Sequence, residues 1–493
     1  MPDPGQPVRS PPGRTLVWLL IGLGALACYR LLVLALGDFD LFSDEAYYWG
    51  WAQSFDFGYY SKPPLIAWTI MATTAVFGDG ELGVKAGTLL IYPVTGIGIY
   101  VLGRVLFGPW VGLVAALAFS TLPGVAVSGL IISTDVLLFA CWTWALVGFA
   151  LALRHDRWRD WVLAGTAGGL GLLAKYTMIL FPVFAIALLA TRREYRHHLR
   201  SPRLYTALAI AAGLFLPNVL WNLANGLVSV RHTVAISGLA GQLFHLDELL
   251  EFLAGQALLM GPLAYLAWLA LVSRPAVWRD PNLRLLAVFS VPFLGTIAVQ
   301  ALLGGANLNW AAPTYVGATL MVVAWGMHAR RRWLLILILG INLAVTPILY
   351  HYQGIRSSLG IASSRDIDPW ARVRGWEQVA NEVARLRARH PERRLVMDER
   401  NVMARLIYYL EPHPFDARMW NPNGRRSDAY RLDADVASAV GEDFLIIAKN
   451  HGPDDLAPFF ARVRALAPVQ IGRYDDDSAR ALRVILADDF QGY

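Results

Sequence analysis

Long apolar runs alternate with short polar segments from about Thr15 to Tyr350, a pattern typical of a bundle of membrane-spanning helices. A helix needs about 20 apolar residues to cross the hydrocarbon core of a bilayer. This criterion predicts eleven spans, near residues 15–36, 84–103, 110–130, 135–153, 160–174, 176–190, 203–221, 248–273, 283–303, 311–327 and 332–350. The stretch 64–78 is apolar but short and begins at a proline pair, which favours a helix lying in the membrane interface.

The pattern changes after residue 352, where charged residues become frequent and no apolar run is long enough to span a membrane. Apolar positions near helical spacing predict a helix over 372–390, and a second helix is expected over 455–466. Short apolar runs predict strands at 395–397, 444–448 and 482–486. Residues 353–493 are therefore expected to form a small α/β domain.

The predicted fold class is a polytopic α-helical membrane protein with about eleven transmembrane helices and a soluble C-terminal α/β domain. Residues 1–14 are rich in proline and are expected to be a disordered cytoplasmic tip, followed by the transmembrane domain over 15–352. The first apolar run has no small-residue cleavage site after it, so we interpret it as a retained helix.

The distribution of lysine and arginine predicts the orientation, because loops on the cytoplasmic side carry an excess of both. With the N-terminus inside, seventeen arginines fall in inner loops of the membrane part, against five basic residues on the outer side. The odd number of spans then places the C-terminal domain on the outer side of the membrane. Basic and acidic residues balance within 353–493, so the net charge of +6 belongs to the membrane part and does not indicate nucleic-acid binding.

The first outer loop, residues 37–82, is the segment richest in candidate chemistry. Its acidic residues are Asp38, Asp40, Asp44, Glu45, Asp56, Asp79 and Glu81. Lys62 is its single cation. Ser43 is a plausible N-cap for a short helix with Asp44 and Glu45 in the first turn, which on its own would make these acids no more than a solvated helix start. Transfer of a sugar from a lipid phosphate needs a base for the acceptor hydroxyl and a cation for the departing phosphate, and Asp44 and Lys62 supply that pair.

The order of motifs resembles the bacterial branch of the protein O-mannosyltransferase superfamily, which includes the aminoarabinose lipid A transferases. An acidic pair, Asp44-Glu45, follows the first helix, and a Tyr-x-x-Lys-Pro turn ends at Lys62-Pro63. Further matches lie downstream at Asp135, at the Lys175-Tyr176 turn and at Asn307-Leu-Asn-Trp310. The resemblance extends along essentially the whole chain. It implies a C-type glycosyltransferase fold, a polyprenyl-phosphate sugar donor and inversion at the anomeric carbon.

Carried over by position, the resemblance implies that Asp44 is the catalytic base and that Glu45 and Asp135 orient it or the acceptor. Lys62 and Lys175 would bind the donor phosphate. Each has a simpler alternative: Asp135 can complement a helix dipole, and Lys175 can extend to the outer lipid headgroups. The further candidates are Arg231 for the phosphate and Tyr59, Tyr60, Tyr176, His232 and Asn309 for the substrate.

This chain departs from the family pattern at Ser61, where some aminoarabinose transferases carry an acid. The departure argues against aminoarabinose as the transferred sugar.

No metal site is predicted, because the ten histidines show no ligand spacing. The residues leave open whether a divalent metal assists as a cofactor.

Three functions remain to be distinguished from the sequence. The first is inverting transfer of a sugar from a polyprenyl-phosphate donor to a hydroxyl of lipid A, another glycolipid or a protein at the periplasmic face. The second is transport or flipping of a lipid-linked sugar, which would predict internal repeats and charges near mid-bilayer. The third is a family member that binds such lipids without turnover. The outer-face clustering of Asp44, Lys62 and Asp135 favours the first.

Overall fold

The computed structural model describes residues 12–238, 244–424, 427–472, 474 and 480–493, which fall into two compact units. The first unit comprises Met1–Val33, Lys62–Leu65 and Thr88–Pro347. The second comprises Leu34–Ser61, Ile66–Gly87 and Ile348–Tyr493. Most of the predicted outer loop therefore belongs to the same unit as the C-terminal tail, although about 270 residues separate them in the chain.

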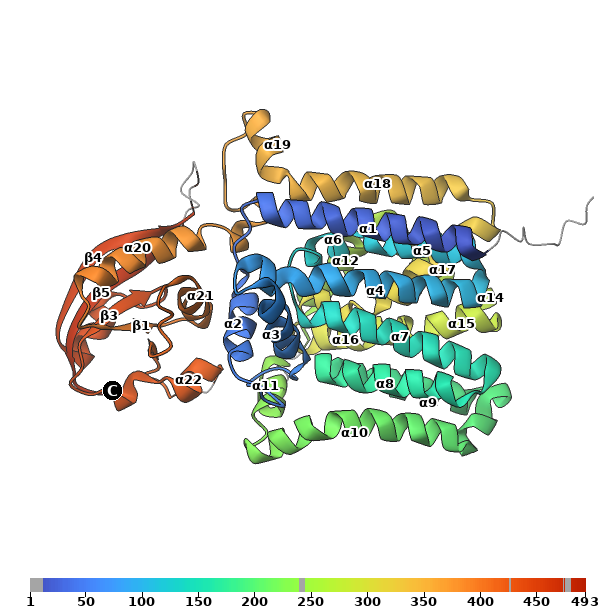
Figure 1. Cartoon of the computed structure of the whole chain (residues 1–493), viewed down its shortest axis with the longest axis horizontal. Helices are drawn as coiled ribbons and strands as arrows, with labels where there is room; N and C mark the ends of the chain where they lie inside the picture. The colour runs from blue at the N-terminus through green and yellow to red at the C-terminus, as the bar shows by residue number, and fades with distance from the viewer. Residues whose placement is uncertain (1–11, 239–243, 425–426, 473, 475–479) are drawn as a thin grey trace, which may run out of the picture. The chain divides into compact units, whose positions relative to one another are not determined.

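The first unit is a helical bundle in which α8 packs between α7 and α10 (Figure 1). Its helices are α1 (Pro12–Leu36), α4 (Glu81–Phe107), α5 (Pro109–Ser120), α6 (Pro123–Ser128), α7 (Thr134–His155), α8 (Trp158–Ala174), α9 (Leu180–Thr191), α10 (Pro202–Ala224), α11 (Val228–Ile236), α12 (Leu246–Met260), α13 (Pro262–Val272), α14 (Pro275–Arg279), α15 (Pro281–Val288), α16 (Val291–Gly304), α17 (Thr314–His328) and α18 (Arg332–Tyr350). Three 3-10 helices complete it: η1 (Tyr176–Ile179), η2 (Arg193–Arg200) and η3 (Leu308–Ala311).

Helices occupy the eleven segments that the apolar runs predict, but 110–130 is divided between α5 and α6, and 283–303 between α15 and α16. Within the described residues, six helices are long and apolar enough to cross a membrane, or up to eight if two sharply bent pairs count as single spans. The predicted single helix over 248–273 is wrong: α12 and α13 meet at an angle of 112°. Gly261 separates them with a φ of 85°, a conformation that only glycine adopts without strain.

The second unit begins with two short helices, α2 (Ser43–Ala52) and α3 (Leu65–Phe77), the latter at the position predicted for a short apolar helix. The helices of the tail are α19 (Tyr352–Ser358), α20 (Trp376–Arg389), α21 (Arg400–Tyr409), α22 (Ala429–Asp433) and α23 (Pro453–Leu456), with the 3-10 helices η4 (Ala371–Val373), η5 (Val436–Ser438) and η6 (Ala457–Phe459).

The tail strands are β1 (Arg394–Met397), β2 (Arg418–Met419), β3 (Phe444–Ala448), β4 (Phe460–Ile471) and β5 (Arg480–Phe490). They form one sheet in the order β2-β1-β3-β5-β4. β1 pairs with β2 and β3 in parallel, and β5 runs antiparallel to both β3 and β4. The three predicted strands are thus confirmed as β1, β3 and part of β5, and the first predicted tail helix is confirmed as α20.

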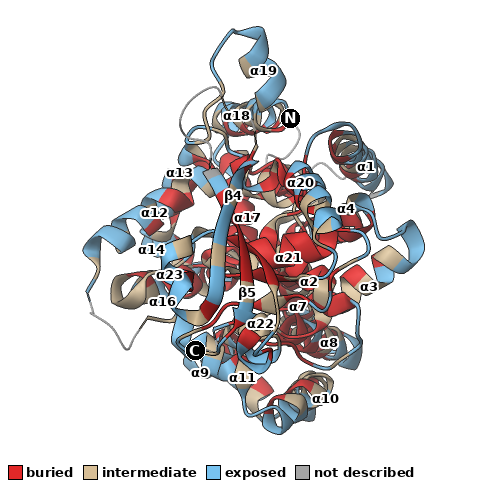
Figure 2. Ribbon diagram, turned by 90° about the vertical axis from the view of Figure 1, so that its left-hand side faces the viewer, coloured by how far each residue is buried: buried red, intermediate tan, exposed pale blue. Residues whose placement is uncertain are grey.

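The predicted helix over 455–466 is wrong, because α23 and η6 end by Phe459 and the chain continues as β4. β4 lies at the edge of the sheet and is largely exposed, whereas β5 beside it is mostly buried (Figure 2). Pairing with β5 organises β4, and the register shifts between Leu466 and Val469, a stretch that contains Pro468.

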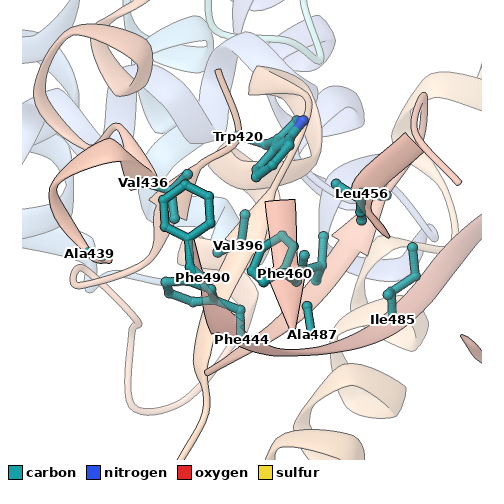
Figure 3. Packing of buried hydrophobic residues seen from close by; sticks show 12 residues of the cluster. Val396, Trp420, Val436, Ala439, Phe444, Leu456, Phe460, Ile485, Ala487 and Phe490 are labelled. Atoms are coloured by element: carbon teal, nitrogen blue, oxygen red, sulfur yellow. The ribbon is translucent and has the colours of Figure 1, made fainter. Parts of the chain in front are cut away.

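An aromatic cluster fills one face of the sheet (Figure 3). Trp420 packs against Phe460 and Phe490 at ring-centroid distances of 5.8 and 6.0 Å, and Phe444 and Val396 close the cluster from the central strands. Burial of each such side chain stabilises the domain by about 1.5–3 kcal/mol. The tail therefore contains a hydrophobic core of its own.

Candidate active site

The start of α2 carries two adjacent acids with opposite environments. The N-cap is Phe42 rather than the predicted Ser43, and its backbone N–H donates to the Glu45 carboxylate at 2.8 Å. Glu45 is fully buried and forms an ion pair of 2.7 Å with Lys85, whose side chain is 2% exposed. Glu45 therefore anchors the first turn, while the neighbouring Asp44 keeps 37% of its side chain exposed.

Asp44 is paired with an arginine from the tail. Nη2 of Arg400, the first residue of α21, lies 2.9 Å from Oδ1 of Asp44. The Arg400 guanidinium also lies over the ring of Tyr47, 5.0 Å from its centroid. Burial alone would lower the pKa of Arg400, but Asp44 and Tyr47 outweigh it and raise the pKa. Sequence reasoning missed Arg400, because nothing in the local pattern of α21 connects it with residue 44.

Backbone contacts join the loop before α2 to the tail. Asp40 accepts a hydrogen bond from the Trp376 backbone N–H at the start of α20, and the Asp40 N–H donates to the Val373 carbonyl at 2.9 Å. Burial raises the pKa of Asp40 to about 6. The Leu41 N–H donates to the Tyr409 hydroxyl at 2.6 Å. These contacts fix the chain on which Asp44 and Glu45 stand.

Tyr59 and Tyr60, predicted to bind substrate, are both buried within the second unit. Tyr59 stacks on Trp51 at 5.2 Å between centroids, and its hydroxyl donates to the Ser54 carbonyl at 2.7 Å. Burial raises the pKa of Tyr59 to about 12, so its hydroxyl stays protonated at neutral pH. In this structure Tyr59 serves to shape the loop after α2.

Three predicted residues of the first unit come together from separate elements. The Lys175 ammonium lies 2.7 Å from Oδ1 of Asp135, and the Asn309 amide donates to Oδ2 of the same carboxylate at 2.6 Å. Asp135 stands in the first turn of α7, Lys175 follows the last residue of α8, and Asn309 lies in η3. The side chains of Asp135 and Lys175 are mostly buried, whereas Asn309 is exposed, so the ion pair itself holds the charge of Lys175 in place.

A second polar group adjoins Lys175 along the chain. The Tyr176 hydroxyl donates to Oδ1 of Asn218 at 3.4 Å, and Asn222 donates to the Tyr176 hydroxyl and to the Asn218 carbonyl. Oδ1 of Asn222 is buried and has no hydrogen-bond partner among the described residues. Buried amide oxygens normally accept a hydrogen bond, so this atom is suited to a hydroxyl donor. Sequence reasoning did not assign a role to Asn218, although an amide on an apolar helix is a signal of function.

The other predicted residues lie on other elements of the two units. Lys62 is half-buried and belongs to the first unit, whereas Asp44 belongs to the second. Arg231 is exposed on α11, and His232 beside it is half-buried. Among the described residues, no group of three or more His, Cys, Asp or Glu side chains is arranged to hold a metal ion.

Comparisons with known proteins identify the class of enzyme. Residues 61–221 match the model of the family described as dolichyl-phosphate-mannose-protein mannosyltransferase. The chain is 32% identical over 433 residues to lipid A galacturonosyltransferase RgtD of Rhizobium johnstonii, covering 86% of this chain and 89% of that protein.

Solved structures show the same fold. ArnT from Cupriavidus metallidurans in the apo state aligns with a TM-score of 0.62 and 15% identity, covering 95% of this chain and 98% of that chain. ArnT bound to undecaprenyl phosphate aligns with a TM-score of 0.61, also at 15% identity, over 97% of this chain and 98% of that chain.

The fold and the relatives define a multi-pass membrane glycosyltransferase that takes its sugar from a polyprenyl phosphate. The chain belongs to the dolichyl-phosphate-mannose-protein mannosyltransferase family, and RgtD is one of its relatives. The resemblance drawn from the sequence motifs is thereby confirmed at the level of family, fold and reaction class.

Proposed function

We propose that this protein transfers a galacturonic acid residue from a polyprenyl phosphate to lipid A at the periplasmic face of a bacterial inner membrane. The observation that carries the proposal is the similarity to RgtD, which extends over 86% of the chain and includes both units. The departure at Ser61 from the aminoarabinose transferases supports a different sugar.

In the proposed mechanism, Asp44 is the general base. Its side chain is partly exposed at the start of α2, whereas the buried Glu45 forms an ion pair with Lys85 and acts as a positioning residue. Asp44 takes the proton of an acceptor hydroxyl, and the hydroxyl oxygen forms a bond to the anomeric carbon from the face opposite the phosphate. The bond between that carbon and the phosphate oxygen breaks, and polyprenyl phosphate leaves with the electron pair. The product has inverted configuration.

Lys62 and Lys175 are proposed to hold the donor phosphate. Lys175 donates to Asp135, whose other oxygen accepts from Asn309, and this ion pair does not use all three ammonium protons, so the ammonium retains donor capacity for a phosphate oxygen. A cation held in place before the reaction stabilises the developing charge on the leaving group without reorganisation. Tyr60, Tyr176, His232 and Asn309 are assigned to the sugar, and Arg231 is assigned to the donor phosphate.

The test is mass spectrometry of lipid A from a deletion strain that carries the intact gene, Asp44→Asn or Asp38→Asn. Loss of a general base typically slows a reaction by about 10²–10⁴-fold, so Asp44→Asn cells are expected to lack the hexuronic acid mass, as deletion cells do. Asp38 is an exposed acid of the same loop, and its variant is the matched control expected to keep the modification. Unchanged lipid A in the deletion strain would refute the proposed acceptor and sugar.

A further inference from the structure

Arg400 contacts the proposed base and is given no role by the mechanism above. Its ion pair with Asp44 uses a single nitrogen, Nη2, which also donates to the Asn401 side chain at 3.0 Å. Within the described residues, Nε and Nη1 of Arg400 make no hydrogen bond. The pair is therefore monodentate, although a guanidinium and a carboxylate pair most strongly through two parallel hydrogen bonds.

The Arg400 guanidinium is held in place by its surroundings rather than by Asp44 alone. It lies over the ring of Tyr47, whose hydroxyl accepts the Ala429 backbone N–H at 2.8 Å and whose ring packs 5.2 Å from that of Tyr430. About a third of the Arg400 side chain is exposed. The guanidinium is thus a planar cation that lies over an aromatic ring and is partly open to solvent. Its Nε and Nη1 donors are unused within the described residues, so it is suited to binding a carboxylate.

We propose that Arg400 binds the carboxylate of the transferred uronic acid and that this contact releases Asp44 to act as the base. This inference rests on the proposed function, because it takes the sugar to be acidic. A carboxylate on the sugar can form the bidentate pair with Arg400 that Asp44 does not form. A neutral hexose lacks that group and leaves Asp44 bound to Arg400. Selectivity for an acidic sugar would then arise from activation of the base as well as from binding.

The simpler role for Arg400 is to orient Asp44, and the two roles predict different results. An orienting residue supports transfer of every sugar equally. A carboxylate-binding residue supports transfer of acidic sugars alone, and its removal frees Asp44 for neutral ones. The ratio of kcat/KM between an acidic and a neutral donor therefore separates them.

The experiment uses the purified full-length protein, lipid A and two undecaprenyl-phosphate donors that carry galacturonic acid or galactose, which differ in one carboxylate. Arg400→Gln is expected to lower kcat/KM for the galacturonic acid donor by at least 100-fold and to leave the galactose donor unchanged or improved. Arg400→Lys keeps the positive charge but lacks the two parallel N–H donors of the guanidinium. This variant is expected to show an intermediate loss of kcat/KM, caused by a higher KM. Arg431→Gln is the matched control, because Arg431 pairs with Asp428 and not with Asp44.

Equal losses on both donors in Arg400→Gln and Arg400→Lys would overturn the carboxylate role and leave the proposed function intact. Equal kcat/KM for the two donors in the unaltered protein would also overturn the carboxylate role of Arg400. If Arg400→Gln does not fold, the donor ratio of Arg400→Lys decides, since an unchanged ratio contradicts the proposal. Failure of the unaltered protein to transfer galacturonic acid at all would instead refute the proposed function, and this inference with it.

Discussion

At the scale of single residues, burial separates the roles of two neighbouring acids. Asp44 and Glu45 are adjacent in sequence, yet Glu45 is sealed against Lys85 while Asp44 remains partly exposed beside Arg400. A buried ion pair contributes little net stability compared with an apolar pair, but loss of one partner leaves an uncompensated charge. Glu45 and Lys85 therefore depend on one another, whereas Asp44 can exchange partners.

Lys85→Met is expected to destabilise the protein by about 3–5 kcal/mol, because it leaves the Glu45 carboxylate buried and unpaired. The double variant Glu45→Gln/Lys85→Met should regain most of this loss. Thermal unfolding in detergent, monitored by tryptophan fluorescence, gives the stability of both variants. A double variant no more stable than Lys85→Met alone would contradict mutual dependence of the pair.

Asp40 gives the stability of the second unit a predicted pH dependence. Its pKa is about 6 in the folded protein against an ordinary value of 3.8, so the folded state holds the proton more tightly than the unfolded state. Stability is therefore expected to fall as pH rises from about 4 to about 6, by roughly 3 kcal/mol in total. Asp40→Asn should remove this part of the pH dependence, since its amide oxygen still accepts the Trp376 N–H. Unfolding curves of both proteins between pH 4 and pH 8 provide the comparison.

The sequence predicted several site residues but not all of their partners. Asp135 and Lys175 stand at helix ends expected on the same side, and the structure joins them at 2.7 Å. Arg400 could not be found in this way. Its contact with Asp44 spans 356 positions and arises from packing of α21 against α2, which no local periodicity encodes.

At the scale of elements, helices with strong apolar patterns were predictable and β4 was not. The segment 455–466 contains alanine, leucine and arginine, which favour a helix, but from Phe460 onward it pairs with β5 in the structure. Tertiary pairing overrides such preferences in strands. The angle between α12 and α13 could not be predicted either, since a glycine–proline break within an apolar run does not specify the direction of the following helix.

Glycine determines how closely α8 and α10 approach. A Cβ at Gly165 would lie 2.4 Å from the Ala207 carbonyl oxygen, whereas a Cβ at Gly213 on α10 would meet no atom within 4 Å. Gly165→Ala is expected to cost about 1–3 kcal/mol through overpacking. Gly213→Ala should be neutral or stabilising by up to about 1 kcal/mol. Melting temperatures of the two variants test this, and equal values would show that the helices separate without cost.

At the scale of the whole molecule, the arginine distribution predicts that the C-terminal domain lies outside and the loop between α7 and α8 inside. Single cysteines at Ser438 and Arg157, both exposed positions, can report this in a chain whose Cys28 and Cys141 are replaced by serine. In spheroplasts, an impermeant maleimide is expected to label Ser438→Cys at once and Arg157→Cys only after permeabilisation. The reverse pattern would contradict the predicted orientation.

The edge strand β4 has a consequence for how copies of this protein coexist in a crowded membrane. An unpaired strand edge is a template on which another chain can add, and long flat edges promote aggregation. β4 interrupts its edge with Pro468 and a register shift, and it exposes Arg462 and Arg464, so a second copy would meet a missing donor and like charges. The opposite edge, β2, is two residues long and offers little backbone to pair with. Neither margin of the sheet therefore offers a long, unbroken backbone edge on which a second C-terminal domain could add a strand.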